Sequence, residues 1–166
     1  METVGDHQAR PNQQDIAQEH YQEGLNWWKQ KKIDKALHHF QKAYDLFPEN
    51  LYISSYLGVT LAKAGIMERG IQLCQKATSK RPFNEDFLYN LGQAYLFAGK
   101  RMEARKTFLL GAKGCSETKR FVGALLQMGV RRKPVIRFLP RNHFLNRWLG
   151  KLTYRPEAAR VQDIEN

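Results

Sequence analysis

The stretch that decides the fold runs from Pro82 to Ala104 and reads PFNEDFLYNLGQAYLFAGKRMEA. An earlier stretch, from Pro48 to Gly70, reads PENLYISSYLGVTLAKAGIMERG and has proline, asparagine and two glycines at matching places. The two stretches are 34 residues apart, and a match at a fixed period of this size is typical of repeated supersecondary units. The sequence therefore predicts a repeat protein.

Each copy carries the signals of two helices joined by a turn. Asn50, Asn84 and Thr118 occupy equivalent positions, and each has a side-chain oxygen that can cap the start of a following helix. Gly65 and Gly99 can adopt the left-handed conformation that ends a helix. The prolines stop the second helix because proline has no amide hydrogen to continue it. Each unit is thus predicted to be helix, turn, helix and stop.

Further slots keep the 34-residue period, and together they resemble the tetratricopeptide repeat. The slots hold small residues, then aromatic residues or Leu, then Phe or Cys: Gly24, Gly58 and Gly92; Trp27, Leu61 and Tyr95; Phe40, Cys74 and Phe108. The resemblance covers three units, 17–50, 51–84 and 85–118, and implies an all-α fold, an α-solenoid of helix-turn-helix units. His20 and Glu23 depart from the pattern, because they stand where the family prefers apolar residues.

We expect the chain to have four parts. Residues 1–13 are expected to be a flexible N-terminus, and 14–130 a repeat domain whose capping helix lies at 119–129, because a stack of three units needs a cap. Residues 131–155 form a basic segment with a short amphipathic helix. Residues 156–166 are expected to be a flexible tail.

The resemblance also implies a concave groove lined by the first helix of each unit. The residues at the groove positions are Tyr21, Leu25, Trp28, Lys29, Tyr52, Tyr56, Val59, Lys63, Tyr89, Gln93 and Phe97. Tyrosine and tryptophan are typical of recognition surfaces, so we expect this groove to bind a peptide segment of another protein. Some of these side chains could instead serve only core packing.

One well-known groove of the family grips the C-terminal carboxylate of a heat-shock chaperone with Lys, Asn and Arg side chains. The corresponding positions here hold Tyr21, Leu25, Tyr56, Asp86 and Asn90. Asp86 would repel a carboxylate. An extended or helical peptide with apolar side chains is the expected ligand.

The net charge of +11 is concentrated near the C-terminus. Between Lys119 and Arg155 there are ten Lys or Arg and no Asp or Glu, and residues 142–152 place apolar side chains on one helical face. That helix could dock on its own protein, on an anionic membrane, on nucleic acid or on an acidic protein partner. The residues predicted to meet an anionic surface are Arg131, Arg132, Lys133, Arg137, Arg141, Arg147, Trp148 and Lys151. A membrane- or nucleic-acid-associated factor is therefore the alternative function.

No motif for catalysis, metal or cofactor binding stands out. His38 and His39 are adjacent and diverge on a helix, so we expect them to be solvent-exposed rather than metal ligands. Cys74 and Cys115 are too few for a disulfide framework. No apolar run reaches the length of a membrane span, and the polar start is not a signal peptide. The expected protein is a non-catalytic adaptor, scaffold or chaperone-like module without a cofactor. Its expected location is the cytoplasm, with the periphery of a membrane as the second option, and the sequence does not specify its oligomeric state.

Overall fold

The computed structural model describes residues 12–129 and 144–145, and among these residues all regular structure is helical. The helices are α1 (Gln13–Lys29), α2 (Ile33–Leu46), α3 (Leu51–Lys63), α4 (Met67–Lys80), α5 (Glu85–Phe97), α6 (Arg101–Gly114) and α7 (Thr118–Met128). The predicted all-α solenoid of helix-turn-helix units is confirmed. The chain divides into two compact units, unit 1 (Met1–Thr107) and unit 2 (Phe108–Asn166), and the division falls within α6.

Asparagine side chains cap the first helix of successive hairpins. Asn12 caps α1 by accepting from the Gln14 amide, and Asn50 and Asn84 cap α3 and α5 in the same way. Thr118 does not repeat this role, because it is the first residue of α7 and its hydroxyl donates to the Cys115 carbonyl at 3.4 Å. The cap expected at Thr118 is therefore wrong, although α7 itself lies where a helix was predicted.

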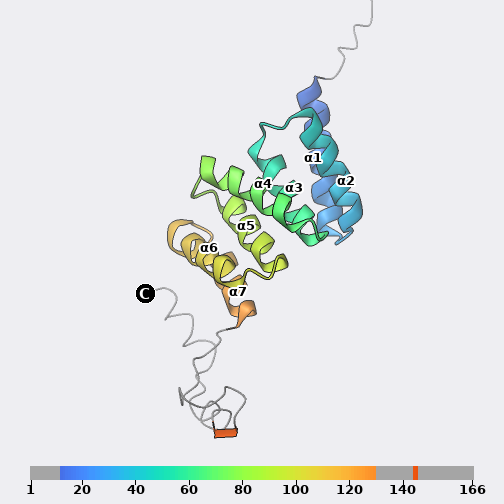
Figure 1. Ribbon diagram of the computed structural model, residues 1–166. Helices are drawn as coiled ribbons and strands as arrows, with labels where there is room; N and C mark the ends of the chain where they lie inside the picture. Colours follow the sequence, from blue (N-terminus) through green and yellow to red (C-terminus); the bar gives the residue numbers. More distant parts are fainter. Residues whose placement is uncertain (1–11, 130–143, 146–166) are drawn as a thin grey trace, which may run out of the picture. The chain divides into compact units, whose positions relative to one another are not determined.

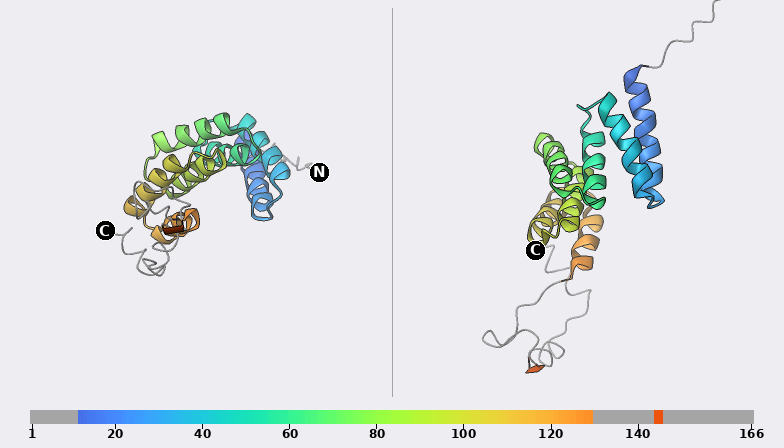
Figure 2. Two further views of the ribbon diagram at one scale, coloured as in Figure 1. Left: turned by 60° about the horizontal axis from the view of Figure 1, so that its bottom comes forward. Right: turned by 45° about the vertical axis from the view of Figure 1, so that its right-hand side comes forward.

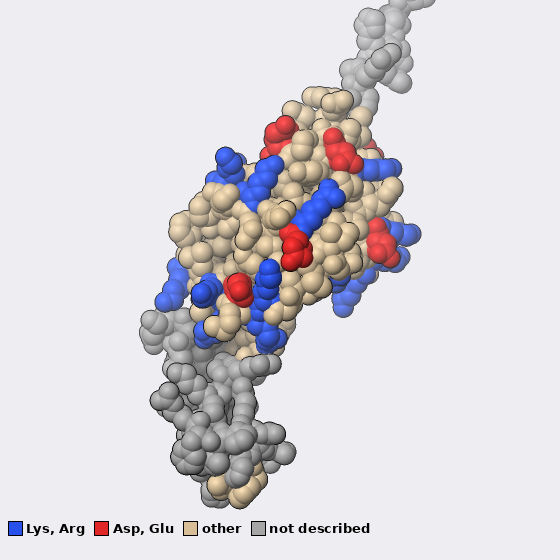
Figure 3. Space-filling model, in the orientation of Figure 1, with Lys and Arg blue, Asp and Glu red and all other residues tan. Residues whose placement is uncertain are grey.

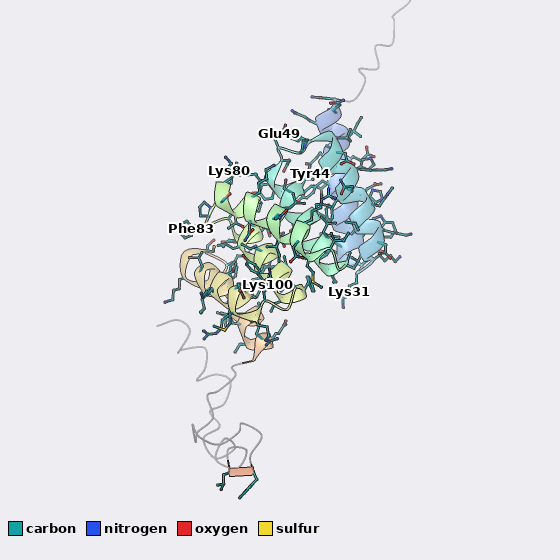
Figure 4. The ribbon with its side chains drawn as sticks, viewed as in Figure 1. Lys31, Tyr44, Glu49, Lys80, Phe83 and Lys100 are labelled. Carbon is teal, nitrogen blue, oxygen red and sulfur yellow. The ribbon has the colours of Figure 1, made fainter. Side chains whose placement is uncertain are left out.

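The turn inside each hairpin has one geometry. Lys31, Gly65 and Gly99 are 34 residues apart and all have positive φ, at 61°, 96° and 71°. In each turn the following amide bonds back to the carbonyl five residues earlier, as in Lys32 to Trp27. Figure 4 shows Lys31 and Lys100, from two of these turns, toward one end of unit 1, and Glu49 and Lys80 toward the other.

The helices of unit 1 pack as hairpins and then against the next hairpin. α1 packs on α2 and α3 on α4, while α3 also contacts α5 and α2 (Figures 1 and 2). The backbones of α3 and α4 approach closely, since a Cβ placed on Gly70 would lie 2.5 Å from the Gly58 carbonyl oxygen. Two glycines are needed there because neither backbone leaves room for a side chain.

The core of unit 1 consists of separate buried clusters that follow one another along the hairpins. Phe40, Leu57 and Leu61 form one buried cluster, and Val59, Cys74 and Leu91 belong to the next. Within unit 2, α7 lays Phe121 against Phe108 of α6, with ring centroids 6.5 Å apart. The division of the chain into the predicted repeats and capping helix, with the residue boundaries given above, stays a prediction.

Candidate functional site

The predicted groove residues lie on α1, α3 and α5, the first helices of the hairpins. Tyr21, Leu25 and Trp28 are spaced by four and three residues, so they share one face of α1. On α3, Tyr52 and Tyr56 are four residues apart and Lys63 follows seven residues later, and on α5, Tyr89, Gln93 and Phe97 are spaced by four, so each set also lies near one helical face. We call the face of Tyr21, Leu25, Trp28, Tyr52, Tyr56, Lys63, Tyr89 and Phe97 the aromatic surface.

One part of the aromatic surface joins α1 to α3 through two phenols. The rings of Tyr21 and Tyr56 meet edge to face with centroids 5.8 Å apart, and both lie about 6 Å from the buried ring of Phe40. Burial raises the pKa of Tyr21 above its ordinary value, and Tyr56 and then Asp86 add to this effect. Asp86 lies in the first turn of α5, so residues of three helices act on one another here.

The other part centres on a lysine. Nζ of Lys63, in the last turn of α3, lies 4.8 Å from the centroid of the Trp28 ring and 5.7 Å from that of Phe97. Both rings are half-buried and pack on the core cluster that contains Val59. An ammonium held near two aromatic rings is stabilised by their quadrupoles. Lys63 thus bridges α1 and α5.

Val59 was expected on this surface, and that expectation is wrong. Its side chain is fully buried, in the same core cluster as Ala62 and Leu91. The reason is that α3 contacts α2, α4 and α5, so its buried face is wider than that of a helix with one neighbour. Val59 belongs to the core on which Trp28 and Phe97 pack, and it offers no surface to a ligand.

The other predicted residues differ in exposure. Tyr52 is half-buried and packs edge-on against Phe87 of α5, with centroids 4.9 Å apart. Leu25 is half-buried against the core cluster of Phe40. Lys29 is exposed, and Tyr89 and Gln93 are half-buried on α5.

Comparison with known proteins agrees with this geometry. A family model described as Tetratricopeptide repeat matches residues 17–50, and a second of the same description matches residues 73–106. The chain is a tetratricopeptide repeat protein. The first match has the bounds of the first predicted unit, whereas the second begins in α4 and ends in α6. No curated protein matches the repeat protein in a sequence search.

Solved structures share the fold. One is described as the first TPR of Spaghetti (RPAP3) bound to the HSP90 peptide SRMEEVD: its TM-score is 0.58 at 17% identity, over 69% of this chain and 91% of that one. The TPR domain of Sgt2 from Aspergillus fumigatus has a TM-score of 0.54 at 20% identity, over 67% of this chain and 77% of that one. At these identities the likeness concerns the fold.

The positions that a carboxylate clamp would use have other tasks in this repeat protein. Asn90 is buried, and its amide donates to the Ser55 hydroxyl at 3.1 Å. Asp86 is half-buried and acts on Tyr21. The described residues of the aromatic surface therefore offer rings and phenols rather than a cluster of free cations.

The predicted anionic-surface residues, 131–141 and 147–151, lie outside the described residues. Of the predicted helix 142–152 only Phe144 and Leu145 are described; both are helical, and Phe144 is 69% exposed. On the face drawn in Figure 3, basic and acidic side chains of the described residues are interspersed. Within the described residues, no helix has both the length and the apolar character needed to cross a bilayer.

Unit 2 contains a cleft of about 1160 Å³ between the end of α6 and the start of α7. Lys113, Glu117 and Lys119 line it together with Val122 and Leu126. Sequence reasoning did not single out this cleft.

A cluster of polar residues was also missed. His20 and Glu23 on α1 meet His39 on α2, with His39 Nδ1 at 2.6 Å and His20 Nδ1 at 3.5 Å from Glu23 Oε2. His39 was expected to be solvent-exposed, but it is half-buried, because α2 turns it toward α1. Burial lowers the pKa of His39, and the Glu23 carboxylate opposes this shift. The available signal was that His20 and Glu23 occupy slots usually filled by apolar residues.

Proposed function

We propose that this tetratricopeptide repeat protein is a non-catalytic interaction module that binds an apolar segment of another protein on the aromatic surface. The observation that carries the proposal is the row of half-buried rings on three helices, with Tyr21 against Tyr56 at one part and Lys63 over Trp28 and Phe97 at the other.

The chemistry of these side chains supports a protein ligand. Tyrosine and tryptophan offer large contact areas with few rotatable bonds, so little entropy is lost when a partner covers them. Packing against the core already restrains Tyr21 and Trp28. Such pre-ordered rings lower the cost of binding.

The charges favour an apolar segment over a free carboxylate terminus. Asp86 lies close enough to Tyr21 to raise its pKa, so a negative group at that part would be repelled. Lys63 lies over two aromatic rings. An apolar side chain can pack on the rings and on the methylene stem of Lys63 while the exposed Lys63 ammonium stays in water.

A peptide selection on the full chain tests the proposal. Twelve-residue random peptides selected on the immobilised protein are expected to be rich in apolar and aromatic residues and to lack a required terminal carboxylate. The affinity of a selected peptide should fall about tenfold or more in Lys63→Ala and Tyr89→Ala, the level expected for interface hot spots. Lys35→Ala is the matched control, because Lys35 also lies over a tryptophan, with Nζ 4.4 Å from the Trp27 ring, but belongs to α2.

Two results would refute the proposal. One is equal binding by the Lys63 and Tyr89 variants and the Lys35 control. The other is a set of ligand-induced amide shifts in an NMR spectrum that avoids α1, α3 and α5. Both measurements use folded protein, because neither variant removes a fully buried side chain.

A further inference from the structure

The cluster of His20, Glu23 and His39 has the composition of a metal site. His20 and Glu23 are one helical turn apart on α1, and His39 faces them from α2. Each supplies one ligand atom, and these three atoms all lie within 4.8 Å of one another. His20 and Glu23 occupy slots that the repeat pattern would fill with apolar residues, so the pattern of the repeat does not call for this cluster.

The distances fit a small tetrahedral ion. Ligand bonds of about 2.0 Å to Zn²⁺ at tetrahedral angles place two ligand atoms about 3.3 Å apart. The two imidazole Nδ1 atoms are 3.4 Å apart, and His20 Nδ1 is 3.5 Å from Glu23 Oε2. The third pair, His39 Nδ1 to Glu23 Oε2, is closer at 2.6 Å, a hydrogen-bond distance. The Glu23 side chain is 49% exposed, so its carboxylate has room to move away from His39 Nδ1 to the spacing of two zinc ligands.

The ligand types fit the same ion. Two imidazoles and one carboxylate form a set suited to Zn²⁺, and a site with three protein ligands keeps its fourth position for water. The side chains of His20 and His39 are 23% and 20% exposed, so an ion can enter and water can reach it. Lys42 acts electrostatically on His39 and opposes a cation, so binding is expected to be weaker than at a closed four-ligand site.

We propose that His20, Glu23 and His39 bind one Zn²⁺ ion through two Nδ1 atoms and a carboxylate oxygen, and that the ion fastens α1 to α2. The first hairpin has local weaknesses that such an ion would offset. The N-cap of α2, Lys32, makes no side-chain capping bond, and Lys31 carries a positive φ in the turn. A ligand that binds only the folded hairpin raises its stability in proportion to the logarithm of ligand concentration over Kd.

The structure also defines the metal-free alternative. His39 can hold a proton on Nδ1 and donate it to Glu23 Oε2 at 2.6 Å, while His20 Nδ1 lies 3.4 Å from His39 Nδ1 and the two ring centroids are 5.5 Å apart. That arrangement is complete without an ion. A measurement of metal binding separates the two states.

The test titrates metal-stripped full-length protein with Zn²⁺ against a chromophoric chelator and follows thermal unfolding. We expect one saturable site, a higher Tm with Zn²⁺, and affinity at least about tenfold weaker in His20→Gln and His39→Gln, because each variant removes a ligand. His38→Gln is the matched control: it is adjacent to His39 and exposed, and should bind as the wild type does. A His7→Gln, His143→Gln double variant should also retain the site.

Three outcomes would overturn the proposal. They are no saturable binding by wild-type protein, equal loss in His38→Gln and His39→Gln, and loss in the double variant of the other two histidines. A readout on wild-type protein keeps the test decisive if a variant unfolds. Long-range proton–nitrogen NMR spectra should show Zn²⁺ moving the Nδ1 signals of two of the five histidines, and unmoved signals refute the site.

Discussion

The side-chain amide of Asn84 donates a hydrogen bond to the Tyr52 hydroxyl oxygen at 3.2 Å, and its carbonyl oxygen accepts one from the Phe87 amide at 3.1 Å. One side chain therefore caps α5 and ties it to α3. Asn50 stands 34 residues earlier and caps α3 by accepting from the Tyr52 and Ile53 amides. The two asparagines occupy the same slot of the repeat, but only the Asn84 side chain also makes a hydrogen bond to a second helix.

Replacing the two asparagines should therefore cost different amounts of stability. Asn50→Ala should lower the free energy of unfolding by about 1 kcal/mol, the usual value of a cap. Asn84→Ala should cost about 2 kcal/mol, because a tertiary hydrogen bond worth about 1 kcal/mol is lost as well. Urea unfolding measures both. In a Tyr52→Phe background the two costs should become equal, and a difference that persists there would contradict this assignment.

Lys31→Gly should stabilise the protein. Lys31 has φ 61° in a slot that holds glycine in the next two hairpins, and the left-handed conformation is unfavourable for a residue with a Cβ. After allowing for the greater freedom of glycine in the unfolded chain, the gain is expected to be about 0.5 to 1 kcal/mol. Lys32→Gly, at φ −88°, is the control and should destabilise. A loss of stability in Lys31→Gly during thermal unfolding would count against strain in this turn.

Alanine should have opposite effects at two helical glycines. In Gly70→Ala the new methyl group would meet the Gly58 carbonyl and the Ala62 backbone, so we expect a loss of about 2 kcal/mol from overpacking. In Gly123→Ala of α7 nothing lies within 4 Å of the new Cβ, and the helix should gain about 0.5 to 1 kcal/mol. Chemical unfolding of both variants checks the pair. Equal effects would mean that α3 and α4 are not in backbone contact.

Tyr21 should make stability fall at high pH. Burial raises the folded-state pKa above the unfolded value of about 10. The contribution of the protonated phenol is therefore complete below about pH 10 and is lost as pH rises through the folded pKa. Above about pH 10 the urea midpoint of the wild type should fall more steeply than that of Tyr21→Phe. The difference in tyrosinate absorbance between the two proteins should appear only above the pH at which an ordinary tyrosine ionises. A titration midpoint near pH 10 for this difference would refute the shift.

Much of the fold could be predicted because its signals are local. Asn50, Asn84, Gly65 and Gly99 act within a few residues of their own positions, and each is found in the predicted cap or turn. The 34-residue period then carried these signals from one hairpin to the next. Thr118 shows the limit of reasoning from the repeat period, because a helix does begin at this slot but no side chain caps it.

The candidate site was less predictable because exposure depends on neighbours. Val59 has the spacing of a surface residue, but contacts of α3 with three other helices bury it. His39 was judged against its sequence neighbour His38, whereas its structural partners are His20 and Glu23 on another helix. Helical periodicity gives the direction of a side chain, and only the packed hairpin shows what it meets.

The buried hydrogen bond from Asn90 to Ser55 has a consequence for how this protein could have diversified. Repeat arrays are often treated as interchangeable modules that can be duplicated, deleted or reordered. A donor on α5 that needs an acceptor on α3 makes the junction between these two modules specific, since a foreign neighbour would leave a polar group buried without a partner. Exchanging the second or third hairpin alone should therefore cost about 1 to 3 kcal/mol of stability.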